Sequence, residues 1–124
     1  MNAHELQTQL AQFHGTQFWT RHPFNRRFLY TDGVKHVAEK ARAYWLLDIL
    51  ATEIAGKVIH VRECFGVVKL AVKDRKAALT VKDDEPGRAL YRRDIAFTDF
   101  PAGDWTFYLV EDGEHAVLML PGEY

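Results

Sequence analysis

The sequence predicts an α+β fold: a short N-terminal helix and one long central helix packed on a four- to five-stranded antiparallel β-meander. Three observations carry this prediction. Apolar residues recur at helical spacing only in the first half of the chain. After Gly56, apolar and polar residues alternate, as they do in strands that bury one face. The connections between the alternating segments are short, and short connections place neighbouring strands antiparallel.

One domain over residues 1–124 accounts for the whole chain. A chain of 124 residues can bury a core without disulfides or metals. Hydrophobic residues make up 48% and charged residues 27%, which are ordinary values for a globular protein and exclude a disordered one. The sequence has no internal repeat or linker that would divide the chain.

A short first helix is expected over residues 5–13, where Leu6 and Leu10 lie on one helical face. The following segment, residues 16–30, is rich in aromatic and basic residues. Pro23 in its middle argues against a regular element. The sequence therefore predicts an irregular connection between the two helices.

The long central helix is expected over residues 33–55. Thr31 or Asp32 can cap its first free N–H groups, and no proline or glycine interrupts the helix before Gly56. Residues 44–50 are apolar nearly all round, which is typical of a helix that is covered on more than one side. This helix is the predicted spine of the fold.

Five strand candidates follow the helix. They are residues 68–73, 77–82, 89–97, 105–109 and 116–120, and residues 58–61 are expected to form a short edge strand or an extended linker. Residues 74–75 and 112–113 are expected to form hairpin turns. Trp45 on the helix and Trp105 on the facing strand are expected to lie in the core.

The composition favours a cytoplasmic protein. The single cysteine, Cys64, cannot form an intramolecular disulfide, and the N-terminal sequence lacks the pattern of a secretory signal. No apolar run approaches the ~20 residues that a membrane-spanning helix needs. The net charge of −1 offers the molecule as a whole no attraction to nucleic acid or anionic lipid.

Asp48 is the one carboxylate inside the apolar helical block. Because burying an unpaired charge is costly, Asp48 is expected either to be paired or to face water. The favoured interpretation is a structural tether between helix and sheet, with Arg93 on the third strand candidate as the partner. A general base and a simply exposed carboxylate are the alternatives.

The aromatic and basic segment, residues 18–30, is the candidate contact surface. The candidate residues are Trp19, Arg21, Phe24, Arg26 and Arg27. Interleaved rings and guanidinium groups can stack on bases and hold phosphates, or contact a partner protein. Alternatively, the rings pack under the central helix and the arginines face water.

No catalytic residue, metal site or cofactor is predicted. The chain contains no serine and no phosphate-binding or dinucleotide-binding glycine motif. His36 and Glu39 share a helix face, but no second histidine spacing completes a metal site. Cys64 has no CxxC partner and is expected to be a small buried thiol.

The C-terminal strand, residues 114–120, is expected at an edge of the sheet. Its alternation gives it two apolar faces, which need cover on both sides, and open strand edges pair with other chains. A homodimer that buries Val117, Met119 and Tyr108 is therefore expected. The alternative is that the irregular N-terminal segment folds over this face.

Four blocks of the sequence resemble a small bacterial family of unknown function, whose members are encoded largely in bacteria, phages and plasmids. The blocks are LYTDGVK (29–35), AEKARAYWLLDIL (38–50), FTDFP (97–101) and LPGEY (120–124). The resemblance covers most of the chain, from about Phe13 to the end. It implies a setting among mobile-element accessory genes and supplies no activity, substrate or catalytic residue.

The function expected from these observations is that of a small non-enzymatic binding protein that contacts a partner protein. The resemblance implies that it serves as an accessory or counter-defence factor of a phage or plasmid. The alternative is a nucleic-acid-associated module that uses residues 18–30. A third possibility is a small enzyme with a carboxylate acid or base, which would need a pocket around Asp48.

Overall fold

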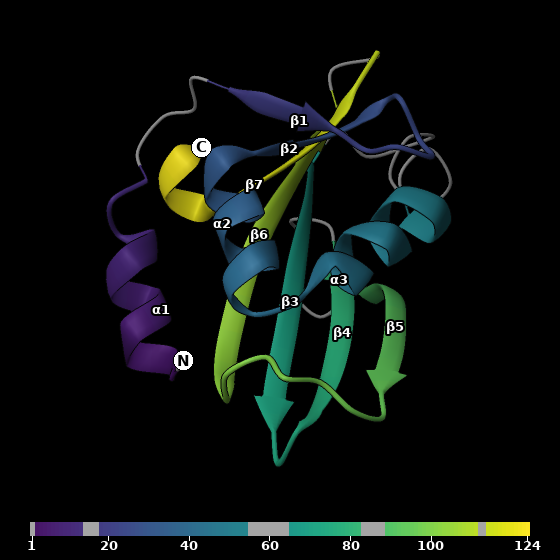
Figure 1. Ribbon diagram of the computed structural model, residues 1–124. Helices are drawn as coiled ribbons and strands as arrows, with labels where there is room; N and C mark the ends of the chain where they lie inside the picture. Colours follow the sequence, from purple (N-terminus) through teal and green to yellow (C-terminus); the bar gives the residue numbers. More distant parts are fainter. Residues whose placement is uncertain (1, 14–17, 55–64, 83–88, 112–113) are drawn as a thin grey trace.

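The described residues form a seven-stranded mixed sheet, and helices α2 and α3 cover one of its faces (Figure 1). The computed structural model describes residues 2–13, 18–54, 65–82, 89–111 and 114–124. The strand order is β1-β2-β7-β6-β3-β4-β5. The strands are β1 (Trp19–Arg21), β2 (Phe28–Thr31), β3 (Phe65–Lys73), β4 (Lys76–Lys82), β5 (Ala89–Ile95), β6 (Gly103–Glu111) and β7 (Ala116–Met119).

The helices are short. They are α1 (Ala3–Leu10), α2 (Asp32–Lys40), α3 (Tyr44–Ile49), the π-helix η1 (Leu50–Ile54) and the 3-10 helix η2 (Pro121–Glu123). Asn2 caps α1, because its side chain accepts a hydrogen bond from the N–H of Glu5 at 2.8 Å. Thr31 caps α2 in the same way through the N–H of Val34, at 3.3 Å. No helix among the described residues is long and apolar enough to cross a membrane.

The prediction of one long central helix is wrong, because the chain breaks between α2 and α3. Arg42 has a φ of 53°, in the left-handed region that ends many helices. The N–H of Ala43 then donates to the carbonyl of Ala38 at 2.9 Å, which closes the last turn of α2. Glycine usually occupies such a position, so an arginine there leaves no signal of the break in the sequence.

The prediction of a four- to five-stranded antiparallel meander is also wrong. Strands β1 and β2 come from the segment that was expected to be irregular, and β2 pairs with β7 in parallel. Strand β6 pairs with β3 instead of β5, so the chain crosses over within the sheet. β1 has only three residues, and β2 has the sequence FLYT, in which apolar and polar residues do not alternate.

Strands β3, β4, β5, β6 and β7 lie where alternation predicted strands. The turn between β3 and β4 is at Asp74 and Arg75, whose φ angles of 52° and 61° are those of a type I′ hairpin turn. The expected strand or linker at residues 58–61 and the expected turn at residues 112–113 lie outside the described residues.

The core lies between the sheet and the helices. Trp105 is buried, and its indole N–H donates to the carbonyl of Pro101 at 2.9 Å. Trp45 is only half-buried and packs against the edge of the core. Leu46 and Leu47 of α3 are buried, whereas Asp48 is exposed. Helix α3 therefore has one exposed face, which carries Tyr44 and Asp48.

The C-terminal segment is fastened to the start of α2 by the buried carboxylate of Glu123. Its Oε1 accepts hydrogen bonds from the hydroxyl of Thr31 at 2.6 Å and the N–H of Leu120 at 3.0 Å. Its Oε2 accepts from the N–H of Gly33 at 3.3 Å. A Cβ at Gly33 would lie 2.5 Å from Leu120 Cδ1, so this position requires glycine. The LYTDGVK and LPGEY blocks thus meet in space.

Strand β7 is not an edge strand, because it lies between β2 and β6. The edge argument for a homodimer is therefore wrong, and the edges of the sheet are β1 and β5. Val117, Met119 and Tyr108 are half-buried on the sheet face opposite the core, and Tyr108 packs on the ring of Tyr124 with centroids 5.6 Å apart. The homodimer stays a prediction. Light scattering tests it, because a mass that stays at 14.3 kDa at micromolar concentration excludes a dimer.

Candidate functional site

Exposed side chains concentrate on strand β1 and on the turn that follows it. We call this set the β1-edge surface: Phe18, Trp19, Arg21, Phe24, Arg26 and Arg27. Phe18, Trp19 and Phe24 are 69%, 53% and 83% exposed. The interpretation that these three rings pack under the central helix is therefore wrong, whereas Phe28 and Tyr30 of the same segment are buried. Three exposed aromatic rings within one short segment indicate a contact surface.

The three arginines of the β1-edge surface are exposed. Within the described part of the chain, none of them forms an ion pair or a side-chain hydrogen bond. Their guanidinium groups therefore keep their hydrogen-bond donors available for a ligand. Arginine beside aromatic rings is the composition of both protein-binding hot spots and nucleic-acid-binding surfaces.

The turn between β1 and β2 is held by the buried side chain of His22, which is only 2% exposed. Its Nδ1 accepts hydrogen bonds from the N–H groups of Phe24 and Asn25, at 3.1 and 3.3 Å. Because Nδ1 accepts, the network assigns the ring proton to Nε2. This Nε2–H donates to Oδ1 of Asp48 on α3 at 2.8 Å.

Asn25 fixes the same turn at a second point. Its side-chain N–H donates to the carbonyl of Ala51 in η1 at 2.8 Å, and its Oδ1 accepts from the N–H of Arg27 at 3.1 Å. Its own carbonyl accepts from the N–H of Phe28 at 3.0 Å. The exposed residues of the turn are thus carried on a backbone that is already ordered, which lowers the entropy cost of binding.

The structure does not bring Asp48 and Arg93 together. Asp48, with a side chain that is 61% exposed, pairs with His22, whereas Arg93 on β5 contacts Glu53 at 3.0 Å. The reason is that α3 and η1 lie across the sheet, so that Asp48 faces the β1 side and Glu53 faces β5. Asp48 tethers the β1–β2 turn instead of β5. Both ring nitrogens of His22 are therefore hydrogen-bonded within the protein.

At the other edge of the sheet, Glu53 Oε2 accepts hydrogen bonds from the hydroxyl of Tyr91 at 2.5 Å and from Arg93 at 3.0 Å. Burial raises the pKa of the Tyr91 hydroxyl, the hydrogen bond to the Glu53 carboxylate raises it further, and Arg93 opposes these effects. Arg92 and Asp94 lie 3.6 Å apart on the same strand. The charges of β5 are therefore paired locally.

The side chain of His36, which shares a helix face with Glu39, links two helices. The Nε2 of His36 is hydrogen-bonded to the side-chain oxygen of Gln9 at 2.6 Å, which joins α2 to α1. Burial lowers the pKa of His36, as does the charge of Lys40, while Glu39 opposes this. No group of three metal-ligating side chains occurs among the described residues. Cys64 lies outside them.

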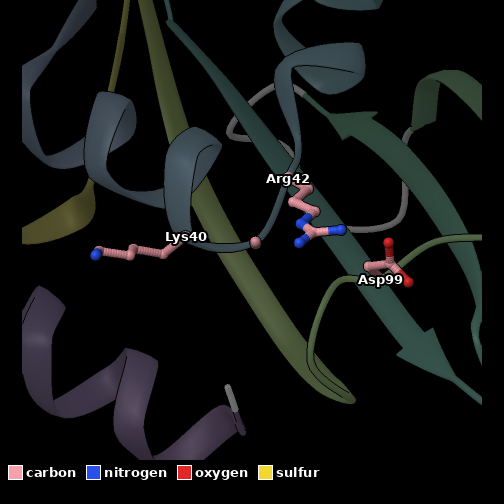
Figure 2. A pocket seen from close by; sticks show the side chains of 4 residues that line it. Lys40, Arg42 and Asp99 are labelled. Carbon is pink, nitrogen blue, oxygen red and sulfur yellow. The ribbon is translucent and has the colours of Figure 1, made fainter.

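A surface cavity of about 370 Å³ lies at the break between α2 and α3, and is lined by Lys40, Ala41, Arg42 and Asp99. Figure 2 shows that the guanidinium group of Arg42 points toward Asp99, whereas Lys40 extends away from both. A cation thus faces a carboxylate across the cavity. This local balance of charge contrasts with the unpaired arginines of the β1-edge surface.

Sequence reasoning missed His22, Asn25 and Glu53 as positioning residues. The His-Pro-Phe-Asn sequence before the second aromatic run carries a local signal, because asparagine side chains bond to the backbone two residues on in turns. The partners Asp48, Ala51 and Tyr91 are distant in the sequence, so no local pattern could identify them.

The fold and its exposed edge define a small α+β protein with helices on one face of a mixed seven-stranded sheet. The chain belongs to the DUF6876 family, a family of unknown function, whose model matches residues 4–124. No curated protein matches the sequence.

One solved structure is similar in fold: the crystal structure of a protein of unknown function from Enterococcus faecalis. The two structures superimpose with a TM-score of 0.56 at 14% sequence identity, over 78% of this chain and 89% of the other. At this identity the similarity concerns the fold alone.

Proposed function

We propose that this protein is a non-enzymatic binding protein, and that it contacts a partner protein through the β1-edge surface. The observation that carries the proposal is the group of three exposed rings beside three arginines without an ionic partner among the described residues. Tryptophan and arginine are the residue types most enriched at the energetic centres of protein interfaces.

The turn that carries Phe24, Arg26 and Arg27 supports the same proposal. It is fastened to α3 through His22 and to η1 through Asn25. Preorganised aromatic and guanidinium groups lose little conformational entropy on binding, so more of the contact energy contributes to affinity.

A protein partner is favoured over nucleic acid by the charge of the whole molecule. The net charge is −1, so the molecule as a whole offers no attraction to a long polyanion beyond the contact site itself. Contact with single-stranded nucleic acid through the same residues is the second candidate. The three arginines and the exposed rings favour it, since bases stack on rings while guanidinium groups hold phosphates.

Photo-crosslinking in cells of the native host tests the proposal. A photoreactive phenylalanine analogue placed at Phe24 is expected to give adducts that are sensitive to protease and insensitive to nuclease. Phe97 is a matched control position, because it is a phenylalanine that is 61% exposed and lies outside the β1-edge surface. Equal adducts from both positions, or none from Phe24, would overturn the proposal, and nuclease-sensitive adducts would favour the second candidate.

The family resemblance adds the expectation that the partner belongs to phage or plasmid biology. An accessory or counter-defence role would use the same surface. Identification of the protein that is crosslinked at Phe24 tests this expectation directly.

A further inference from the structure

The outer edge of β1 carries backbone groups that do not bond to β2. Trp19 lies opposite Thr31 and Arg21 lies opposite Leu29. The N–H of His22 donates to the carbonyl of Phe28 at 2.9 Å, so His22 belongs to a hydrogen-bonded pair. Hydrogen-bonded and non-hydrogen-bonded pairs alternate along an antiparallel ladder. The N–H and C=O groups of Trp19 and Arg21 therefore point away from β2.

These groups have no backbone partner among the described residues, since β1 pairs with β2 alone. An edge of this kind is a template for a further strand. Trp19 and Arg21 are two residues apart, so their side chains lie on the same face of β1 and flank any added strand together.

The charges beside this edge specify the chemistry of the added strand. Arg21 is on β1 itself, and Arg26 is in the adjoining turn. Arg27 follows Arg26, but its carbonyl accepts from the N–H of Ala116 at the start of β7, on the side of β2 away from this edge. All three are exposed and lack an ionic partner within the described ranges. Arg21 lies on the edge itself, so a carboxylate of an incoming segment can pair with its guanidinium group while the backbone of that segment bonds to Trp19 and Arg21.

We propose that the free edge of β1 takes up an extended acidic segment of the partner protein as an added strand. This inference rests on the proposed function and adds the mode of contact and the chemistry of the partner. Backbone pairing supplies affinity that is independent of sequence, and the arginines select for acidic side chains.

A synthetic peptide of alternating valine and glutamate is a suitable probe for isothermal titration and NMR. It is expected to bind the full-length protein and to protect the amides of Trp19 and Arg21 from hydrogen exchange. A copy of the peptide with an N-methylated backbone has the same charge and no N–H donors, so it is expected not to bind. Oligothymidylate is titrated in the same way to test for binding of single-stranded nucleic acid.

Two variants of one residue separate backbone pairing from charge. R21Q and R21P both remove the guanidinium group, but only proline removes the N–H that points away from β2. Because that N–H is not part of the ladder, R21P is expected to fold. It should bind the peptide about fivefold more weakly than R21Q, as for the loss of one net hydrogen bond.

Equal binding by R21P and R21Q, or binding of the N-methylated peptide, would overturn the inference and leave the proposed contact surface in place. Failure of the acidic peptide to bind the wild-type protein would also overturn it. Unchanged binding by W19A and R21Q would remove the proposed function as well. Binding of oligothymidylate but not of the peptide would replace both by nucleic-acid recognition.

Discussion

The two edges of the sheet differ in length, in charge and in whether their charged side chains have ionic partners. Strand β5 has seven residues, and its consecutive residues Arg92, Arg93 and Asp94 are charged and locally paired. Strand β1 has three residues and presents the exposed ring of Trp19 beside Arg21. Arg21 has no ionic partner among the described residues. Both edges are anchored to the same α3–η1 element, through Asp48 on one side and Glu53 on the other.

The difference in charge indicates which edge is protected from pairing with other chains. A row of charges is a common device that prevents edge-to-edge association, and β5 has such a row. β1 instead has exposed rings next to outward-pointing backbone groups. Such a surface would be a liability in a protein that binds nothing, and its turn is nevertheless ordered by partly buried hydrogen bonds. The β1 edge is the one whose exposure suits a binding function.

The largest expected effect is at the anchor of the β1 edge. Replacing His22 by alanine removes the acceptor for two backbone N–H groups and the partner of Asp48. The free energy of unfolding should fall by about 2–3 kcal/mol, because a buried network loses its central member. Chemical denaturation measures this, and NMR should report the change at residues 22–27 and leave β5 unaffected. An unchanged denaturation midpoint would contradict the assigned role of His22.

A smaller effect is expected at the anchor of the β5 edge. Tyr91→Phe removes the hydrogen bond to Glu53, which should cost about 1 kcal/mol at neutral pH. Denaturation at pH 7 measures it. If Tyr91→Phe lowered the free energy of unfolding as much as His22→Ala does, the two edges would depend equally on their anchors. The proposed difference between the edges would then be wrong.

The stability that Tyr91 contributes is also expected to depend on pH. The pKa of Tyr91 is raised in the folded protein by burial and by Glu53, so unfolded chains lose this proton first as the pH rises. The stability that Tyr91 contributes is therefore fully present below pH ~10, the ordinary tyrosine pKa, and is lost at higher pH. The difference in stability between wild type and Tyr91→Phe should shrink above that pH. A difference that stays constant through alkaline pH would contradict this cause.

Asp48→Asn is expected to have a still smaller effect. The Nε2–H of His22 can donate to an amide oxygen as well as to a carboxylate, so the geometry of the turn is retained. The cost should be below about 1 kcal/mol, whereas Asp48→Ala should cost more because it leaves the N–H without an acceptor. Equal destabilisation by the two variants would mean that the charge, and not the hydrogen bond, holds the turn.

The smallest effect on stability is expected for Trp19→Ala and Phe24→Ala. Both rings are mostly exposed, so the free energy of unfolding should change by less than about 0.5 kcal/mol, while binding to the partner should be lost. Thermal denaturation beside a binding assay separates the two quantities. A large loss of stability would show that these rings pack against the protein in solution and would remove the contrast between the two edges.

The composition of the surface could be predicted from the sequence, but its exposure could not. The surface residues Trp19, Arg21, Phe24, Arg26 and Arg27 could be recognised because aromatic and basic residues are unusual neighbours in one irregular segment. Their exposure could not be predicted, since a ring in a loop can equally pack inward.

Asp48 was recognisable as an anomaly because its neighbours are apolar, but its partner was not. His22 lies 26 residues earlier in the chain, and the pairing depends on how α3 crosses the sheet. The break at Arg42 was also beyond prediction. Its backbone has the conformation of a glycine position, and tertiary packing of α2 and α3 on the same sheet face imposes it.

By itself, the sequence determined that helices precede a set of strands, the positions of β3 to β7, and the Thr31 cap of α2. These features depend on residue spacing and on contacts between near neighbours, which a chain carries locally. The tertiary structure alone decided the helix break, the parallel pairing of β2 with β7 and the choice of β1 and β5 as edges. It also decided the partners of Asp48 and Arg93. All of these depend on contacts between residues that are far apart in the chain, and such contacts are selected by burial of the whole core at once.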